Sequence, residues 1–150
     1  MLAYPIYKAI KEQLKNIAPC FYYRNQYKES PDNTSFKVPA IFIEMPKSTT
    51  LNFYGKKLLA AQKAQITIHY VSYAPFKAVD NSLQDTLLAA HNGILIDINK
   101  ALCGWNAIDA DSKILTQQFI PIASDELNFI PEKVFSTITY QTEIYTRHLQ

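Results

Sequence analysis

The feature that most constrains the fold is an alternating segment near the end of the chain, KVFSTITYQTEIYTR, residues 133–147. Its apolar side chains, such as Val134 and Tyr140, fall on one face, and threonines and other polar side chains fall on the opposite face. This period of two predicts a long strand of an antiparallel sheet that is covered on one face. Residues 65–73, QITIHYVSY, repeat the pattern, and the short apolar run VPAIFIEMP, residues 38–46, predicts a further strand between two prolines.

Two other segments show helical spacing. Ile6, Ile10 and Leu14 recur at every fourth residue, which predicts a one-sided surface helix that begins near Pro5 and ends before Pro19. Farther along, residues 83–103 predict a longer helix of about 31 Å at ~1.5 Å per residue. Its broad apolar stripe comprises Leu83, Leu87, Leu88, Ile94, Leu95, Ile98 and Leu102.

The ends of this longer helix carry recognisable signals. Ser82 is the expected N-cap and Gly104 the expected C-terminal stop. A helix this long and apolar is expected to lie across the sheet, and Gly93 within it favours close packing against a neighbouring element.

These elements predict a single α+β domain over residues 1–150: an antiparallel sheet of about four to five strands, with two helices packed on one face. The length of 150 residues, with 48% hydrophobic and 19% charged residues, is typical of one globular domain. The remaining segments predict, in order, a weak strand at 20–27, an exposed loop at 28–37, a strand at 113–124 that Pro121 interrupts or places at an edge, and a turn-like connection at 125–133.

Residues 52–73, NFYGKKLLAAQKAQITIHYVSY, leave two interpretations open. The good helix formers in KKLLAAQKA favour a helix that runs into a strand. The aromatic residues before Gly55, the glycine itself and the strand that follows favour a β-hairpin arm. The hairpin is the preferred interpretation, with Lys56 and Lys57 near the tip of an arm that covers residues 48–65.

No pattern in the chain predicts catalysis, a cofactor or a metal, and we expect the protein not to be an enzyme. Three glycines are too few for a phosphate-binding loop or a Gly-x-Ser-x-Gly turn. Asp109 and Asp111 resemble the start of a calcium loop, but the required Gly and closing Glu are missing. We expect His69 to make an ordinary cross-strand contact and His91 to be a hydrogen-bonded packing residue.

The cysteines and the net charge limit the classes of function that the sequence allows. Cys20 and Cys103 show no metal or disulfide spacing, so we expect buried thiols. A formal charge of +2 is too small for the basic footprint of a nucleic-acid-binding protein. Lysines beside the aromatic residues of the arm could contact a nucleic acid, but protection of exposed strand edges is the preferred explanation. The start of the chain lacks the apolar core of a signal peptide, and no apolar run reaches the ~20 residues of a membrane span, so we expect a soluble protein made in a reducing cytoplasm.

The order of these elements resembles the α+β fold of bacteriophage tail terminator, or tail completion, proteins. The resemblance covers nearly the whole chain. It depends on the helix PIYKAIKEQLKNI, the strand VPAIFIEM, the strand AQITIHYVSY followed by SLQDTLLAAHNGILIDINKAL, and the closing strand VFSTITYQTEIYTR. The loop at 28–37 and the region at 105–133 are longer than the family pattern, and the family has no catalytic residues to transfer.

The resemblance implies a structural protein that forms a ring, commonly a hexamer, at the head-proximal end of a phage tail tube. Such a ring ends tube polymerisation and joins tail to head. The implied partners are further copies of this chain, the tail-tube protein and a head-completion protein. The implied location is the tail–head junction of a virion that is assembled in the bacterial host cytoplasm, without a membrane or sequence-specific nucleic-acid contact.

The arm and the loop at 28–37 are the elements expected to reach a neighbouring subunit. The candidate contact residues are Phe53, Tyr54, Gly55, Lys56, Lys57, Tyr27 and Phe36. The alternative function is a stand-alone ligand- or nucleic-acid-binding α+β module of non-viral function.

Overall fold

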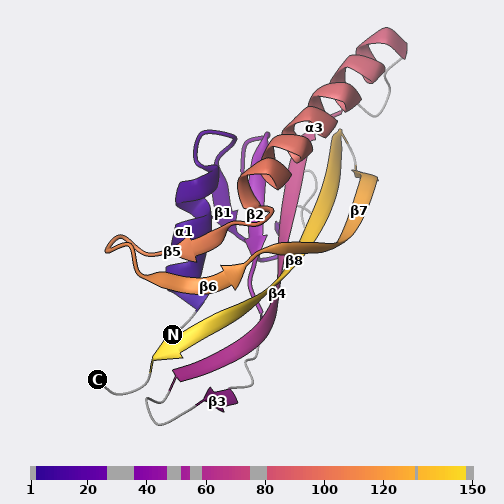
Figure 1. Ribbon diagram of the computed structural model, residues 1–150. Helices are drawn as coiled ribbons and strands as arrows, with labels where there is room; N and C mark the ends of the chain where they lie inside the picture. Colours follow the sequence, from indigo (N-terminus) through magenta and orange to yellow (C-terminus); the bar gives the residue numbers. More distant parts are fainter. Residues whose placement is uncertain are drawn as a thin grey trace.

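The computed structural model describes residues 3–26, 36–46, 52–54, 59–74, 81–130 and 132–147. Within these residues, two helices and eight strands form an α+β fold (Figure 1), so the predicted class is confirmed. The sheet has more strands than the predicted four to five, because several of them are very short. The elements are α1 (Ala3–Leu14), β1 (Cys20–Tyr22), β2 (Ala40–Glu44), β3 (Asn52–Tyr54), β4 (Leu59–Tyr73), α3 (Asn81–Leu102), β5 (Asn106–Ile108), β6 (Ile114–Gln118), β7 (Ile120–Ile130) and β8 (Lys133–Arg147).

The long strands β4 and β8 form the centre of the sheet. They pair antiparallel over their full length, from Leu59 opposite Arg147 to Tyr73 opposite Lys133. β2 lies antiparallel on the other edge of β4, and β6 and β7 both pair with β8. The short strand β1 is parallel to β2, so the prediction of a wholly antiparallel sheet is wrong at this edge. The connection between β1 and β2 exceeds a dozen residues, which is the length that a parallel pair needs.

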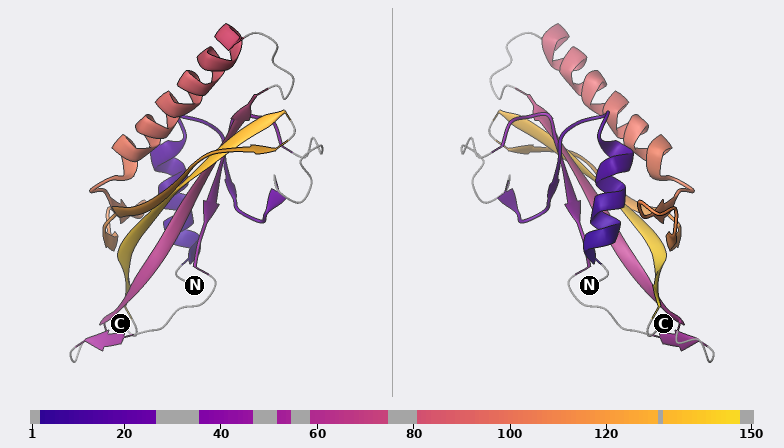
Figure 2. Two further views of the ribbon diagram at one scale, coloured as in Figure 1. Left: turned by 90° about the vertical axis from the view of Figure 1, so that its right-hand side faces the viewer. Right: turned by 90° about the vertical axis from the view of Figure 1, so that its left-hand side faces the viewer.

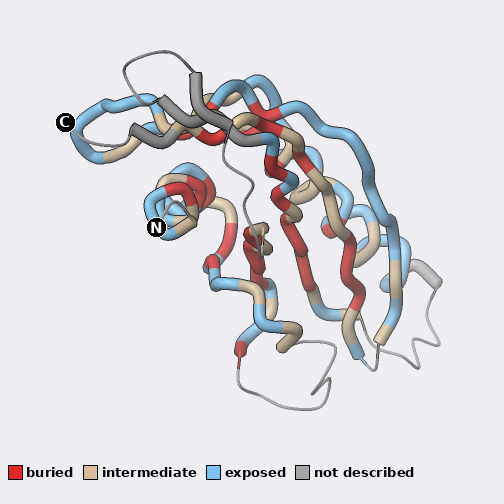
Figure 3. The backbone as a smooth tube through the Cα atoms, turned by 90° about the horizontal axis from the view of Figure 1, so that it is seen from below, coloured by how far each residue is buried: buried red, intermediate tan, exposed pale blue. Residues whose placement is uncertain are grey.

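The sheet curls around α1, so that its two faces differ (Figures 2 and 3). Alternate residues of the central strands, such as Ile66 and Tyr140, point to the helices and are buried with Ile6 of α1 and Ile98 of α3. The opposite face carries a smaller apolar cluster, formed by Phe36, Ala40, Phe42, Val71 and Phe135. The predicted alternation of β8 is therefore confirmed, and it assigns the main core to the helix-bearing face.

Within the described residues, the two halves of α3 are covered to different extents. Ile98 is fully buried, whereas Leu83, in the same stripe, is 48% exposed, and residues 83–86 are all exposed. Figure 1 shows the first half of the helix extending beyond the sheet. The prediction that the helix lies across the sheet is wrong for this half. The first half is uncovered because the strands end too early. The imidazole of His91, near the middle of α3, contacts Ser72, which is next to the last residue of β4.

Of the two predictions made for glycines in this region, one is confirmed and one is wrong. Gly104 follows the helix with a φ of 77°, the left-handed conformation that glycine adopts without strain, so the predicted stop is confirmed. A Cβ added at Gly93 would meet nothing within 4 Å. The predicted close packing at Gly93 is therefore wrong. The helix begins at Asn81, one residue before the predicted N-cap Ser82.

β7 replaces the turn that the sequence predicts at residues 125–133. The strand continues to Ile130 and pairs with β8 through Asn128 opposite Phe135. Two irregularities of register interrupt the pairing, and Leu127, within the second, has a φ of 41°. Turn-forming residues are tolerated here because β8 supplies a hydrogen-bonding partner and bulges absorb the irregular backbone.

The hairpin interpretation of the arm is confirmed where the backbone is described. β3 pairs antiparallel with the start of β4, with Asn52 opposite Ala61 and Tyr54 opposite Leu59. The alternative helix is wrong for residues 59–64, which belong to β4. Strand pairing with β8, and with β3 at residues 59–61, overrides the helical propensity of Leu, Ala and Gln.

Candidate interaction surfaces

A buried histidine joins α3 to the sheet. His91 is 1% exposed; its Nδ1 lies 2.7 Å from the Ser72 hydroxyl oxygen and its Nε2 lies 2.9 Å from that of Ser136. Burial lowers the pKa of His91 to about 4, so the ring is neutral at physiological pH. Histidine and serine are also catalytic residue types; Ser136 is likewise 1% exposed, whereas Ser72 is partly exposed. The predicted packing role of His91 is confirmed.

The same serine connects α3 to the edge strand β7. Besides its contact with His91, the Ser136 hydroxyl oxygen accepts a hydrogen bond of 3.1 Å from the backbone N–H of Leu127. The middle of α3 and the bulge of β7 therefore lie on either side of one side chain of β8.

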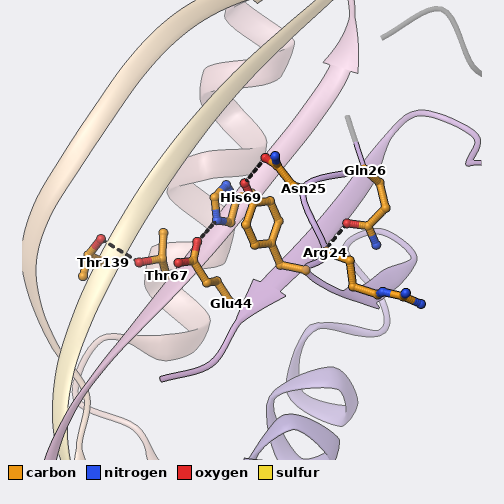
Figure 4. A network of polar contacts seen from close by, with 8 residues as sticks. Arg24, Asn25, Gln26, Glu44, Thr67, His69 and Thr139 are labelled. Atoms are coloured by element: carbon orange, nitrogen blue, oxygen red, sulfur yellow. Dashed lines mark hydrogen bonds and ion pairs between the residues drawn. The ribbon is translucent and has the colours of Figure 1, made fainter. Parts of the chain in front are cut away.

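A second histidine occupies the opposite face of the sheet (Figure 4). The Nε2 atom of His69 lies 2.7 Å from a carboxylate oxygen of Glu44 on the neighbouring strand β2. The ring of Tyr23 stacks on the imidazole with centroids 4.0 Å apart, and the Tyr23 hydroxyl donates a hydrogen bond of 2.7 Å to Asn25. The predicted cross-strand contact of His69 is confirmed. The cluster also fixes the segment after β1 against the sheet.

The described part of the chain shows no reactive cysteine pair and no cluster of possible metal ligands. Burial raises the pKa of the Cys20 thiol to about 11, which makes it an inert packing residue. Cys103 is exposed, so the prediction that it is buried is wrong; it follows the last turn of α3, outside the apolar stripe. Within the described ranges, no three His, Cys, Asp or Glu side chains cluster as metal ligands would. Neither of the two helices has the length and apolar content of a membrane span.

Exposed apolar side chains occur on both α3 and β7, the two elements that the Ser136 hydroxyl connects. On β7, Leu127 is 43% and Phe129 is 52% exposed. Phe129 is opposite Val134, a buried residue of β8, and paired residues share a face of the sheet. We call this surface the α3–β7 corner; its residues are Leu83, Leu87, Leu88, Leu127 and Phe129, of which Leu87 and Leu88 are half-buried.

Sequence patterns alone missed this corner, although one signal for it is present. Residues 86–96, TLLAAHNGILI, contain no charged residue, and Ile96 on the other side of the helix is 47% exposed. A helix that is apolar on several sides is normally buried on several sides. The pattern predicts that the whole stripe packs against the sheet, because a sequence does not reveal where the strands beneath a helix end.

The predicted contact residues are only partly placed. Phe53 and Tyr54 lie in β3, the outer strand of the arm. Phe36 is 9% exposed and packs edge-on against Phe42, with ring centroids 5.0 Å apart, so it contacts its own chain. The other four predicted contact residues lie outside the described residues: Tyr27, Gly55, Lys56 and Lys57. Phe53 and Tyr54 are thus neighbours in β3, whereas Phe36 belongs to the apolar cluster with Phe42 and Val71.

Comparison with known proteins gives a likeness of fold. No family model matches the sequence, and no curated protein matches it either. Among solved structures, 31 chains are similar. One of them is a chain in the virion of a native gene transfer agent particle, with 7% sequence identity, a TM-score of 0.51, and coverage of 96% of both chains. At this identity the likeness establishes a shared α+β fold over nearly the full length of both chains.

Proposed function

We propose that this protein is a structural component of a phage-like particle, in the manner of a tail terminator. In this role, copies of the chain form a ring, commonly a hexamer, at the head-proximal end of the tail tube. The ring stops tube polymerisation and contacts a head-completion protein. The role is non-catalytic and places the protein at the tail–head junction after assembly in the host cytoplasm.

The observation that carries the proposal is the full-length likeness to a chain of a gene transfer agent virion. The likeness spans the helices, the sheet and their connections, so it concerns a whole subunit and not a common supersecondary motif. Two further features support a protein that assembles. The hairpin β3–β4 projects at one end of the molecule, and exposed apolar side chains occur on both α3 and β7.

The proposal is tested with purified protein and a candidate tail-tube protein from the same genome. We expect monomers or weak oligomers in dilute solution, and rings at high concentration or at one end of each tube. Sedimentation velocity and electron microscopy measure both states. If rings are absent with and without tube protein, and tube length is unaffected, the proposed role is wrong.

The predicted arm is tested by removing its tip, residues 55–58, and closing the hairpin with a two-residue turn. We expect the domain to remain folded by circular dichroism while ring assembly is lost. Ring assembly that survives the deletion would assign the arm to another purpose.

A further inference from the structure

Two outer strands lie on opposite sides of the central pair β4–β8. β1 borders β2 on one side, and β7 borders β8 on the other. Neither strand has a second partner strand within the described residues. Figure 1 shows β1 beside α1 at the left of the sheet and β7 at the right. The outer edge of such a strand carries backbone N–H and C=O groups that can pair with another chain.

The side chains of β7 are acidic and apolar, and most of them are exposed. Residues 120–127 are all exposed, and among the large apolar side chains Ile120 is 60% and Phe129 is 52% exposed. Asp125 and Glu126 are the charged residues of the strand, which contains no Lys or Arg. Neither carboxylate forms an ion pair with any residue that the structure describes. β7 therefore presents negative charge and apolar surface together along one edge of the sheet.

The opposite edge is aromatic and basic. The ring of Tyr7 on α1 packs edge-on against Tyr22 of β1, with centroids 5.3 Å apart, and Tyr4 lies 6.5 Å from Tyr7. The ammonium group of Lys8 lies 5.5 Å from the ring centroid of Tyr4, and that of Lys11 lies 5.8 Å from that of Tyr7. We call this surface the α1–β1 edge; its residues are Tyr4, Tyr7, Lys8, Lys11 and Tyr22.

The charge of this edge is not balanced within the described part of the chain. Lys8 and Lys11 are exposed, and neither forms an ion pair with a described residue, whereas Lys15 on the next turn pairs with Glu12. Tyr4 is 62% exposed beside them. Exposed aromatic side chains are typical anchors of protein interfaces, and flanking charges select the partner. The α1–β1 edge is therefore suited to an acidic, partly apolar protein surface.

We propose that the β7 edge of one copy docks against the α1–β1 edge of a neighbouring copy. The inference rests on the proposed function in taking a second copy of this chain as the occupant. Charge complementarity favours that occupant, because the unpaired carboxylates of β7 match the unpaired lysines of α1, and the apolar side chains of β7 match the tyrosines. A two-fold contact of β7 with itself, centred on Asp125 and Glu126, would instead bring like charges together.

The contact is heterologous, because two different surfaces meet. Repeated contacts of this type close into a ring when the rotation between neighbours permits. The two edges lie on opposite sides of the same sheet, so one copy can engage a neighbour on each side at once.

The experiment uses two variants that each reverse the charge of one edge. Lys8→Glu/Lys11→Glu makes both edges acidic, and Asp125→Lys/Glu126→Lys makes both edges basic. Each variant alone is expected to associate about tenfold or more weakly than the native chain in sedimentation velocity, because like charges then face each other. Circular dichroism checks that both variants are folded.

A matched control separates a local effect from an effect of net charge. Lys100→Glu/Lys113→Glu changes the net charge by the same amount as the α1 variant, at two exposed positions outside both edges. Its association should stay close to that of the native chain. A loss as large as that of the α1 variant would overturn the proposal, and so would a native chain that is monomeric at every concentration.

Mixing the two edge variants gives the decisive result. In an equimolar mixture, each acidic edge can meet a basic edge of the other variant, so association should return although each variant alone is weak. All four substitutions in one chain should restore association in the same way. Folded variants that stay monomeric in the mixture would overturn the proposal.

The virion role can fail or succeed separately from this contact. A chain that is found in purified particles, and whose edge variants assemble as well as the native chain, would keep the virion role and lose the contact. Complementation between the edge variants, without any binding to tail tubes or effect on their length, would keep the contact and refute the virion role.

Discussion

At the scale of single residues, the buried polar side chains join the elements of this fold. His91 contacts serines of β4 and β8, and Ser136 also accepts a hydrogen bond from β7. One imidazole and one hydroxyl therefore connect four elements where the sheet ends. A buried donor or acceptor that loses its partner costs about 1–3 kcal/mol, so these groups fix the position of α3.

The titration of His91 gives a pH-dependent stability. The folded-state pKa of about 4 lies below the ordinary value of 6.5, so the unfolded chain binds a proton first as the pH falls. Stability is then lost as the pH falls through the window from 6.5 to 4. We expect the free energy of unfolding to drop by about 2 kcal/mol from this group between pH 7.5 and pH 5.

Urea unfolding at both pH values measures this drop, with His91→Gln as the control. The glutamine variant should be less stable at pH 7.5 and should lose about 2 kcal/mol less on acidification. An equal pH dependence in both proteins would show that another group is responsible.

At the scale of elements, the two halves of α3 differ in how much of their apolar surface is buried. The second half is part of the main core, and the first half extends into solvent with the same apolar stripe. The hydrophobic pattern predicted one continuous buried stripe. The stripe is continuous along the helix, but the sheet covers only part of it. β7 shows the converse: turn-forming residues adopt a strand because β8 is next to them.

Matched truncations in α3 distinguish its two halves. Ile98→Ala removes a fully buried side chain and should lower the free energy of unfolding by about 2–5 kcal/mol. Leu83→Ala should change it by about 0.5 kcal/mol or less, since the side chain is already half exposed. Chemical denaturation of the dilute monomer measures both. A large cost for Leu83→Ala would mean that the first half of α3 is covered within the monomer.

At the scale of the whole molecule, basic and acidic residues are unevenly distributed along the chain. The chain has a formal charge of +2, and residues 45–65 contain four lysines and no Asp or Glu, but Lys63 of this segment is opposite Glu143 of β8. Such polarity has little effect on the stability of one subunit. Its effect is on the rate and orientation of association between subunits.

Self-association is therefore expected to weaken as the salt concentration rises. The Debye length falls from about 10 Å at 0.1 M to about 3 Å at 1 M ionic strength, which screens attraction between the β7 edge and the α1–β1 edge. Sedimentation equilibrium across this range measures the dissociation constant. Association that strengthens with salt would assign the contact to apolar surface without a contribution from the charged edges.

The sequence by itself determined the elements that have a clear period. Local geometry explains the alternation in β4 and β8 and the spacing of four residues in α1, because the buried face of an element repeats at a fixed interval. It also determined the helix stop at Gly104, the cross-strand contact of His69 and the hydrogen-bonded packing role of His91, since a left-handed turn and a buried imidazole each have few solutions.

Only the tertiary structure decided which faces are covered and what each strand pairs with. Coverage of α3 depends on where β4 and β8 end, and the strand at residues 59–64 depends on partners distant in sequence. The α3–β7 corner likewise joins residues 83–88 to Leu127 and Phe129 across some forty positions of chain. Periodicity describes one element at a time, whereas exposure is a property of several elements packed together.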